Sequence, residues 1–482
     1  MLSFLKIFLE KEFDSLSVGY IKKGSSFTIK SLSSSLDCLI IEDLDCEFGS
    51  AGEYIKHNGK IIIYGESRKR QFKLWVYGVL ERIAALHNIV CFLKRNKYTH
   101  FIFFSCDASK RELFWGEQRH THLIPPLFSG RERLKAWLFR SFFFFPLMPF
   151  WGVIASRISF ENTIFRKIVK KLRLLGMKTE LHQCFISMTG CVVLIFADSI
   201  IRIGISSMGG KRVIQNAEML KKANKVSPEI GKKIIPHVID SGFLNETAYS
   251  IENRLNGING SLLIAEPKSL QKMTREAADY LIEMHSRTTQ TVRVDRQFLQ
   301  NYIKKPIELI SAFSNIERHK QLLKQIEVFS VNALLETDIP LVFAHGDFKV
   351  ENMTFQEETK VLTGLFDWDL AGEKQLPVLD LYHLLISNDI LLKDVDLSKS
   401  VATKLFPLNL AEWESKILWD YYVGMDIPFQ LERSLALMYW VMQVFKRIFF
   451  SPNKKNVSIW LDDVIASLGA EIDFKEMVCR GE

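Results

Sequence analysis

Short apolar runs alternate with polar turns in the middle of the chain, and apolar positions at helical spacing dominate after it. The short runs are rich in β-branched residues, which predicts strands, and the helical spacing predicts amphipathic helices. The predicted strands cover residues 184–187, 191–197, 200–205, 234–239 and 247–254, with a turn at 240–242 between the last two. The predicted helices cover residues 211–225, 273–287, 293–336, 379–389 and 410–450.

A predicted hairpin follows a polar loop about two-thirds of the way along the chain. The apolar run 341–344 leads into the loop, and the runs 352–355 and 361–366 are expected to pair across a short turn. This hairpin would bring Asn352 and Asp367 to neighbouring strand ends. An amide oxygen and a carboxylate on such rigid elements can share one hard cation.

The polar loop contains a third candidate residue, Asp347, five positions before Asn352. Residues 345–352 read HGDFKVEN, so an asparagine follows Asp347 by five positions, and Asp367 follows the return strand. Magnesium-dependent phosphoryl transfer needs one carboxylate to orient the attacking hydroxyl and accept its proton. It also needs an amide and a second carboxylate to hold the metal on the nucleotide phosphates. The pattern therefore predicts Asp347 as catalytic base and Asn352 and Asp367 as magnesium ligands.

This segment resembles the catalytic segment of the aminoglycoside phosphotransferase and choline kinase superfamily. The family pattern is HGDxxxxN, then I-D-W and D-P-x-x-D-L, and this chain continues with FDWDLAG and LPVLDL. The resemblance covers about residues 178–482 and implies an α+β two-lobed, protein-kinase-like domain that uses ATP and Mg²⁺. It implies the same roles for the three residues above, and it makes Asp380 a buried support for the catalytic loop, together with His345.

Lys349 departs from the family pattern, which often has His-Pro-Gly before the asparagine. A lysine at this place is closer to the loop of protein kinases, and it is expected to reach the transferred phosphate as a point charge. The alternative is a solvated surface lysine with no catalytic role.

The strand-rich half resembles the nucleotide-binding lobe of the same superfamily. Thr189 and Gly190 lie in the turn between the first two strands, where backbone amides can cradle phosphate, although one glycine makes a sparse loop. Arg202 occupies the place of the family's phosphate-binding base on the third strand. Glu218, on the following helix, is the expected partner of Arg202, and a solvated helix glutamate is the alternative.

The predicted nucleotide-binding lobe covers residues 178–257 and ends in a hinge-like segment, 249–257, that contains Glu252. In the family the backbone of this hinge binds the adenine edge. Residues 258–482 are expected to form the helical lobe, in which 293–336 is an insertion that shapes the acceptor pocket.

The first third of the chain is predicted to be a separate α/β domain. Two of its runs, DCLII at 37–41 and NGKIII at 58–63, resemble strands from the later half of a methyltransferase-like Rossmann domain. The glycine-rich loop that would cradle a cofactor is missing, so residues 1–135 are expected to be a degenerate Rossmann-like accessory or docking domain. The predicted elements are strands at 36–42, 59–64 and 100–105 and a helix at 70–93, in a parallel sheet.

An apolar segment with basic flanks connects the two predicted parts. The apolar run at 136–155 is shorter than the about 20 residues of a spanning helix, contains two prolines and abuts arginines, so it is not expected to cross a bilayer. The basic residues could instead hold 136–173 at an anionic membrane surface as a peripheral contact. The favoured alternative is a buried connector over 136–177 with a solvated basic helix.

Charge and cysteines exclude some classes of protein. The net charge of +8 suits anionic nucleotides, yet no nucleic-acid-binding module is recognisable. Seven cysteines, an odd number without a C-x-x-C pair, favour a reducing compartment, and the charged residues in 1–13 argue against a signal peptide. A cytoplasmic protein, peripheral to the membrane at most, is therefore expected.

These observations favour an ATP- and Mg²⁺-dependent phosphotransferase that moves the γ-phosphate to a hydroxyl of a small molecule, sugar or glycan. A nucleotide-binding pseudokinase or assembly module stays open as an alternative, suggested by the sparse loop at Gly190 and by Arg202. A bifunctional methyltransferase-kinase is a third interpretation, in which residues 1–135 would bind S-adenosylmethionine.

Overall fold

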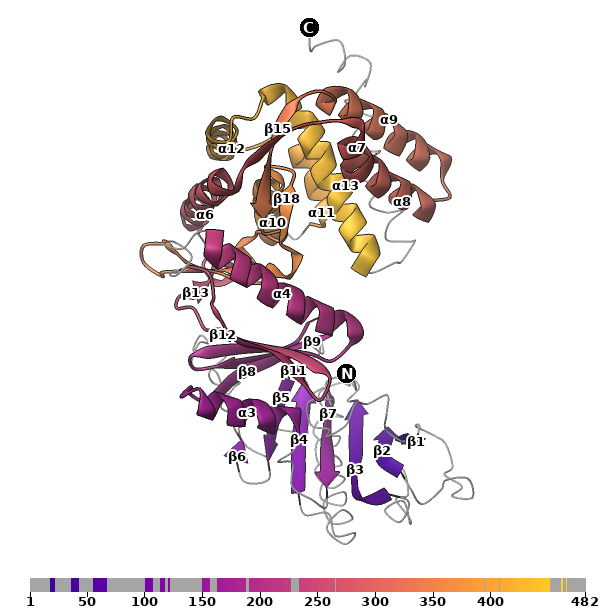
Figure 1. The fold of residues 1–482 in the computed structure, drawn as a ribbon, viewed down its shortest axis with the longest axis vertical. Coiled ribbons are helices and arrows are strands. Elements are labelled where there is room, and N and C mark those ends of the chain that lie inside the picture. Colours follow the sequence, from indigo (N-terminus) through magenta and orange to yellow (C-terminus); the bar gives the residue numbers. More distant parts are fainter. Residues whose placement is uncertain are drawn as a thin grey trace, which may run out of the picture. The chain divides into compact units, whose positions relative to one another are not determined.

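The chain, described by a computed structural model, divides into two compact units (Figure 1). Unit 1 comprises residues 1–214 and 238–254, and unit 2 comprises residues 215–237 and 255–482. Before residue 163 only the backbone of seven strands, β1 to β7, is described. The described residues after it are 163–187, 190–226, 234–264, 266–393, 395–406, 408–450, 461–462 and 465.

The first sheet of unit 1 is mixed rather than parallel. Its strand order is β1-β2-β3-β7-β4-β5-β6, in which β1, β2 and β3 pair in parallel and β7 runs antiparallel to both β3 and β4. The predicted strands at 36–42, 59–64 and 100–105 are confirmed, and the predicted helix at 70–93 lies outside the described residues. The strands are β1 Val18–Ile21, β2 Leu36–Glu42, β3 Ile55–Glu66, β4 His100–Cys106, β5 Leu113–Glu117, β6 His120–Thr121 and β7 Phe150–Ser156.

Strand β7 corrects the prediction of an all-parallel sheet and changes the predicted connector. Its residues, FWGVIAS, come from the end of the apolar segment at 136–155, and they lie inside the sheet between β3 and β4. Aromatic and β-branched residues such as Phe150, Trp151, Val153 and Ile154 favour the strand conformation. The Rossmann-like interpretation of this sheet stays a prediction.

The second sheet of unit 1 has five antiparallel strands in the order β11-β12-β10-β9-β8. The three strands predicted between residues 184 and 205 are confirmed. The bounds are β8 Leu181–Ile186, β9 Cys191–Phe196, β10 Ser199–Gly204, β11 Val238–Leu244 and β12 Thr247–Asn253, and helix α4, Ser207–Val226, follows β10.

The turn between β11 and β12 lies further along the chain than predicted. The prediction ended the first strand at residue 239 and put the turn at 240–242, but β11 continues through these residues. The chain reverses at Asn245 and Glu246, whose φ angles of 47° and 65° are both left-handed. Two consecutive left-handed residues form the tight hairpin turn whose twist matches the flanking strands, and asparagine tolerates this conformation well.

Helix α3, Ile164–Leu174, is the basic helix predicted after the connector. Its buried residues are apolar, and the ammonium group of Lys171 lies 2.6 Å from the Asp240 carboxylate of β11. Leu174, at its end, is 80% exposed. Among the described residues, no helix is long and apolar enough to span a membrane. Contact of 136–173 with a membrane surface stays a prediction.

Unit 2 consists mainly of helices around two small three-stranded sheets, β13-β16-β17 and β14-β15-β18 (Figure 1). The predicted helical segments and the predicted hairpin after the polar loop are confirmed. The helices are α6 Pro267–Thr288, α7 Arg296–Leu299, α8 Lys305–Phe313, α9 Glu317–Leu334, α10 Leu379–Lys393, α11 Leu397–Ser400, α12 Glu412–Gly424 and α13 Glu432–Phe450. The strands are β13 Ile258–Asn259, β14 Gln290–Arg293, β15 Asp338–Ala344, β16 Met353–Phe355, β17 Leu362–Leu365 and β18 Gly372–Gln375.

Helix α10 lies at the centre of the core of unit 2. It contacts α6, α11 and α13, and every residue from Asp380 to Asp389 is buried. Such burial on all sides explains why its apolar residues do not follow one stripe. Polar side chains on a helix of this kind need partners inside the protein. Asp380 and His383 are two of them.

Candidate active site

The polar loop between β15 and β16 holds the predicted catalytic residues and begins with a tight bend. Gly346 has a φ of +81°, a left-handed conformation that glycine adopts without the strain that a side chain would add. A Cβ atom at this position would overlap the backbone of Leu370. Two backbones thus approach closely here, and only glycine satisfies both requirements.

We expect Gly346→Ala to lower the free energy of unfolding by about 3 kcal/mol, because left-handed strain and a backbone overlap each cost about 1–3 kcal/mol. Denaturant unfolding measures the change. Gly176 is the matched control, since its φ is also left-handed, at +71°, but an added Cβ would meet nothing within 4 Å. An equal loss in Gly346→Ala and Gly176→Ala would show that contact with Leu370 is unimportant.

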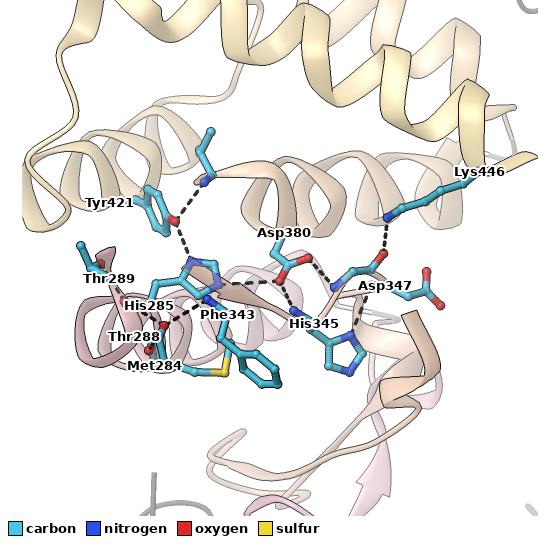
Figure 2. Close-up of polar contacts among 12 residues, drawn as sticks. Met284, His285, Thr288, Thr289, Phe343, His345, Asp347, Asp380, Tyr421 and Lys446 are labelled. Carbon is cyan, nitrogen blue, oxygen red and sulfur yellow. Dashed lines mark hydrogen bonds and ion pairs between the residues drawn. The ribbon is translucent and has the colours of Figure 1, made fainter. Parts of the chain in front are cut away.

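Asp380 supports the loop from the first turn of α10, as the family resemblance implied (Figure 2). Its two carboxylate oxygens accept the backbone N–H groups of His345 at 2.6 Å and of Gly346 at 2.9 Å. Burial raises the pKa of the Asp380 carboxyl, but the neighbouring His285 and the Gly346 amide overcome this effect and lower that pKa to about 2. Asp380 is therefore a buried carboxylate that is ionised across the physiological range.

A buried histidine on α6 continues this network. The Tyr421 hydroxyl of α12 accepts the Val378 N–H at 2.9 Å and lies 2.6 Å from Nδ1 of His285. The Tyr421 hydroxyl can therefore donate its own proton to Nδ1 of His285. The other ring nitrogen, Nε2, lies 3.7 Å from the Asp380 carboxylate (Figure 2). His285 therefore lies between Tyr421 and Asp380 as a buried neighbour of that carboxylate.

His345 joins the loop to the end of the hairpin. Its Nδ1 accepts the backbone N–H of Asp347 at 3.3 Å, and its Nε2 lies 3.1 Å from the carbonyl oxygen of Phe366. Burial lowers the pKa of the His345 imidazole, so the ring is neutral and donates Nε2–H to the carbonyl. The residue before Asp367 is thereby attached to the loop that carries Asp347.

Asp347 is held by donors on both of its carboxylate oxygens. Oδ2 accepts the Asn352 amide at 2.9 Å and lies 3.0 Å from the Lys349 ammonium, while Oδ1 lies 2.9 Å from Nε2 of His383. Burial raises the pKa of the Asp347 carboxyl, but His383 and Lys349 outweigh it and hold that pKa well below its usual range. The side chain keeps 21% exposure, so an ionised, oriented carboxylate remains accessible to a substrate.

Lys349 pairs with the carboxylate of Asp347. Burial lowers the pKa of its amine, but the negative charge of Asp347 outweighs this effect and raises the pKa. The lysine stays charged, and its side chain is 26% exposed. It therefore is a fixed cation beside the proposed base instead of a fully solvated surface lysine.

Asn352 and Asp367 are joined through the hairpin ends, where the backbone N–H of Phe366 donates to the carbonyl oxygen of Asn352 at 3.0 Å. The amide nitrogen of Asn352 donates to both the carbonyl and the carboxylate of Asp347, which leaves its amide oxygen available as a ligand. Asp367 has a left-handed φ of 71°, an uncommon backbone conformation that persists only where the surroundings impose it. An amide oxygen and a carboxylate suit a hard cation such as Mg²⁺, which takes its remaining ligands from phosphate and water.

No group of three or more His, Cys, Asp or Glu side chains that could hold a metal occurs within the part of the chain that the structure describes. A pair made of one asparagine and one aspartate differs from such an all-protein cage. It fits Mg²⁺ only together with a nucleotide.

The predicted nucleotide-binding residues of unit 1 lie around the β8–β9 turn and on β10 and β12. Thr189 lies outside the described residues, and Gly190 has a left-handed φ of 79°. Nε of Arg202 lies 3.2 Å from the carboxylate of Glu252, which is 1% exposed and also accepts the hydroxyl of Ser250.

The partner of Arg202 in its own unit is thus Glu252, which sequence reasoning had placed in the hinge. The two residues come close because β10 and β12 are neighbouring antiparallel strands. Glu218, the partner expected from helical spacing, is exposed on α4 within unit 2. A Glu218 ion pair and a role for Glu252 in nucleotide binding stay predictions.

Two residues beside the loop were missed in the sequence. His383 lies three residues after Asp380 on α10, so the two side chains emerge on similar sides of the helix, and this spacing could have revealed it. Lys446, on α13, donates to the carbonyl oxygen of Gly346 at 2.7 Å (Figure 2). Nothing in the local sequence indicates this contact, because the two residues are 100 positions apart.

Comparison with known proteins confirms the family resemblance over part of the chain. Residues 235–394 match the model of the phosphotransferase enzyme family, and this segment contains the polar loop, Asp367, Asp380 and His383. No match is found among curated proteins.

Two solved structures illustrate the structural similarity. A choline/ethanolamine kinase family protein from Mesorhizobium loti is 15% identical, with 65% of this chain and 97% of that chain covered and a TM-score of 0.41. An aminoglycoside phosphotransferase from Streptomyces rimosus is 15% identical, with 57% and 96% covered and a TM-score of 0.35.

Proposed function

We propose that the chain is an ATP- and Mg²⁺-dependent phosphotransferase that moves the γ-phosphate of ATP to a hydroxyl group. The observation that carries this proposal is the arrangement of Asp347, whose ionised carboxylate is oriented by Asn352, Lys349 and His383 and yet remains partly exposed. The match of residues 235–394 to the phosphotransferase enzyme family supports it.

Asp347 would accept the hydrogen of the acceptor hydroxyl and aim its oxygen at the γ-phosphorus. As the new O–P bond forms and the bond to the leaving oxygen of ADP breaks, the hydroxyl proton passes to the carboxylate. The low pKa of Asp347 makes it a weak base, so proton transfer is expected to come late. Most of the rate enhancement would come from positioning, as expected for a loose transition state.

Asn352 and Asp367 would hold Mg²⁺, which neutralises charge on the phosphates when it is bound. Lys349 carries a fixed positive charge next to Asp347, and we assign it to the transferred phosphoryl group. In unit 1 we assign Gly190 and Arg202 to the nucleotide phosphates. The ion pair with Glu252 restricts the guanidinium of Arg202 to one orientation, which reduces the entropy lost when phosphate binds.

Asp367→Asn should lower kcat at least about 100-fold and raise the Mg²⁺ concentration needed for half-maximal activity, because a neutral amide replaces the anionic ligand. Magnesium titration of ADP formation measures both effects. Glu373→Gln is the control, since Glu373 is 60% exposed and forms an ion pair with the exposed Lys222. An unchanged magnesium requirement in Asp367→Asn would remove Asp367 from the metal site.

The proposed acceptor is a neutral or anionic hydroxyl compound, such as a small molecule, a sugar or a glycan. Lys349 balances the charge of Asp347, and Lys446 and Arg447 add two cations at the end of α13, where Lys446 contacts the loop. Such surroundings would repel a polycationic aminoglycoside more than a neutral or acidic sugar.

A panel of matched acceptors tests both the reaction and this preference. ADP formation is measured with neutral sugars, the corresponding uronic acids and the corresponding amino sugars, each with and without Mg²⁺. We expect magnesium-dependent turnover that is fastest among the neutral or acidic members. Turnover confined to the amino sugars would contradict the acceptor class while retaining the phosphotransferase activity.

A further inference from the structure

His383 and Tyr439 form a buried chain that ends on the carboxylate of Asp347. Nε2 of His383 lies 2.9 Å from Oδ1 of Asp347, and Nδ1 lies 2.9 Å from the hydroxyl of Tyr439. The histidine side chain is 9% exposed and Tyr439 is fully buried. The three residues belong to α10, α13 and the loop, so three separate elements meet in this chain.

We propose that His383 is a positioning residue for phosphoryl transfer, held in its tautomer by Tyr439, and that it directs the acceptor hydroxyl to Oδ1 of Asp347. This inference rests on the proposed function of Asp347 as the base. It adds residues outside the HGDxxxxN motif and names the oxygen that receives the proton.

The donor and the acceptor of each hydrogen bond in this chain follow from the protonation states of Asp347, His383 and Tyr439. An ionised Asp347 can only accept, so Nε2 of His383 must carry the proton between them. In the neutral ring Nδ1 then accepts, and the hydroxyl of Tyr439 is the donor that it contacts. Burial raises the pKa of Tyr439, so its phenol keeps the proton that it donates. The chain thus runs from Tyr439 through His383 to Asp347 in one direction.

Charged groups around the imidazole agree with this assignment. Asp347 faces it from the loop, with Lys349 on the far oxygen of that carboxylate. From α13, the charge of Arg447 acts on Tyr439. Asp380, one helical turn earlier on α10, is engaged by the backbone of His345 and Gly346 instead of by His383.

Counting lone pairs identifies the oxygen that remains open to a substrate. Each carboxylate oxygen accepts about two hydrogen bonds. Within the described part of the chain, Oδ2 of Asp347 already takes the Asn352 amide and the Lys349 ammonium, whereas Oδ1 takes only His383. The acceptor hydroxyl therefore binds Oδ1 beside Nε2 of His383.

The proton balance of the step follows directly. The acceptor oxygen forms its bond to the γ-phosphorus, ADP leaves with the electrons of the broken bond, and the hydroxyl proton passes to Oδ1. His383 keeps its own proton and fixes the plane of the carboxylate. Without this anchor the carboxylate can rotate, and a misplacement of about 1 Å can cost about 100-fold in rate.

Four single variants and one double variant of the full chain test the proposal through kcat, the KM for ATP and the pH profile of kcat. His383→Leu should lower kcat about 10- to 100-fold, leave the KM for ATP within about twofold, and move the acidic limb of the profile to higher pH. His383→Gln retains an N–H donor near the position of Nε2 and should restore most of the rate. Tyr439→Phe should lower kcat by about 2- to 10-fold on its own but cause no further loss in the His383→Leu background.

Tyr382→Phe is the matched control, because Tyr382 lies next to His383 in sequence but its buried hydroxyl pairs with that of Tyr422. It should leave the acidic limb in place. The positioning role is overturned if His383→Leu keeps the wild-type rate and pH profile. It is equally overturned by two results together. In the first, His383→Gln has a kcat as low as that of His383→Leu. In the second, the losses of kcat in Tyr439→Phe and His383→Leu multiply in the double variant, because independent losses without rescue are those expected from a packing defect alone.

Imidazole nitrogen NMR of His383, assigned with His383→Leu, separates this inference from the proposed function. If the wild-type chain forms no ADP, the function fails, and the tautomer of the His383 ring still reports on its contacts with Asp347 and Tyr439. We expect a proton on Nε2 and none on Nδ1. A ring whose Nδ1 carries a proton overturns the inference whatever the enzymatic result.

Discussion

Asp347→Asn should lower kcat about 100- to 10,000-fold, the range expected when a general base is removed, while the dissociation constant of ATP changes little. An asparagine cannot take the hydroxyl proton. Its amide nitrogen would also face donors, because the Asp347 carboxylate is surrounded by the Asn352 amide, the Lys349 ammonium and His383. The acceptor hydroxyl would lose both its base and its orientation.

Steady-state ADP formation and calorimetric titration with ATP analogues separate the two effects of this change. Asp338→Asn is the matched control, since Asp338 lies at the exposed start of β15 and pairs only at 3.5 Å with Arg293. It should retain wild-type kcat. If Asp347→Asn keeps more than about a tenth of the wild-type kcat, Asp347 is not the base.

Asp380→Asn should lower the free energy of unfolding by about 3–5 kcal/mol, as expected when one member of a buried charged network is lost. Asp380 now accepts hydrogen bonds from two backbone N–H groups. In the asparagine variant, one of these N–H groups would face the side-chain amide N–H, so two donors would oppose each other. Since these amides belong to His345 and Gly346, the loop should also lose its conformation, and activity should fall together with stability.

The same residue predicts how stability depends on pH. The pKa of Asp380 is lowered by folding to about 2, so its carboxylate contributes stability that is complete above the pKa of the unfolded chain, about 4. That contribution, about 2 kcal/mol, is lost as pH falls from about 4 to 2. Denaturant midpoints measured across this range should fall in the wild-type chain and fall less in Asp380→Asn.

Asp279→Asn is the control for both Asp380 experiments, because Asp279 is 53% exposed and pairs with Arg275 one turn away on α6. It should cost less than about 1 kcal/mol. A similarly small loss in Asp380→Asn would contradict the supporting role of that carboxylate.

The local part of the site could be predicted from the sequence. The strand, polar loop and hairpin around Asp347, Asn352 and Asp367 follow from apolar runs and turn signals within about 30 residues. For such segments, local hydrogen bonding and hydrophobic periodicity determine the structure directly. The support of the loop by Asp380 came from the family resemblance, and the structure supplies its two backbone donors.

The remainder depends on contacts between distant segments. His383 meets Tyr439 across 56 residues and His285 meets Tyr421 across 136, and no periodicity links such pairs. The partner Glu252 for Arg202 requires the pairing of β10 with β12, which the strand pattern alone does not specify. Strand β7 looked like a connector because its apolar run follows two prolines, and only its insertion between β3 and β4 identifies it.

We propose that this chain transfers phosphate from ATP to a hydroxyl at Asp347. The most direct test follows the γ-phosphate by phosphorus NMR during incubation of the wild-type chain with ATP, Mg²⁺ and the neutral and acidic sugar panel. We predict that a phosphomonoester resonance grows as ATP is converted to ADP, and that it is absent with Asp347→Asn. Nucleotide binding without any loss of the γ-phosphate would contradict the claim and identify a pseudokinase instead.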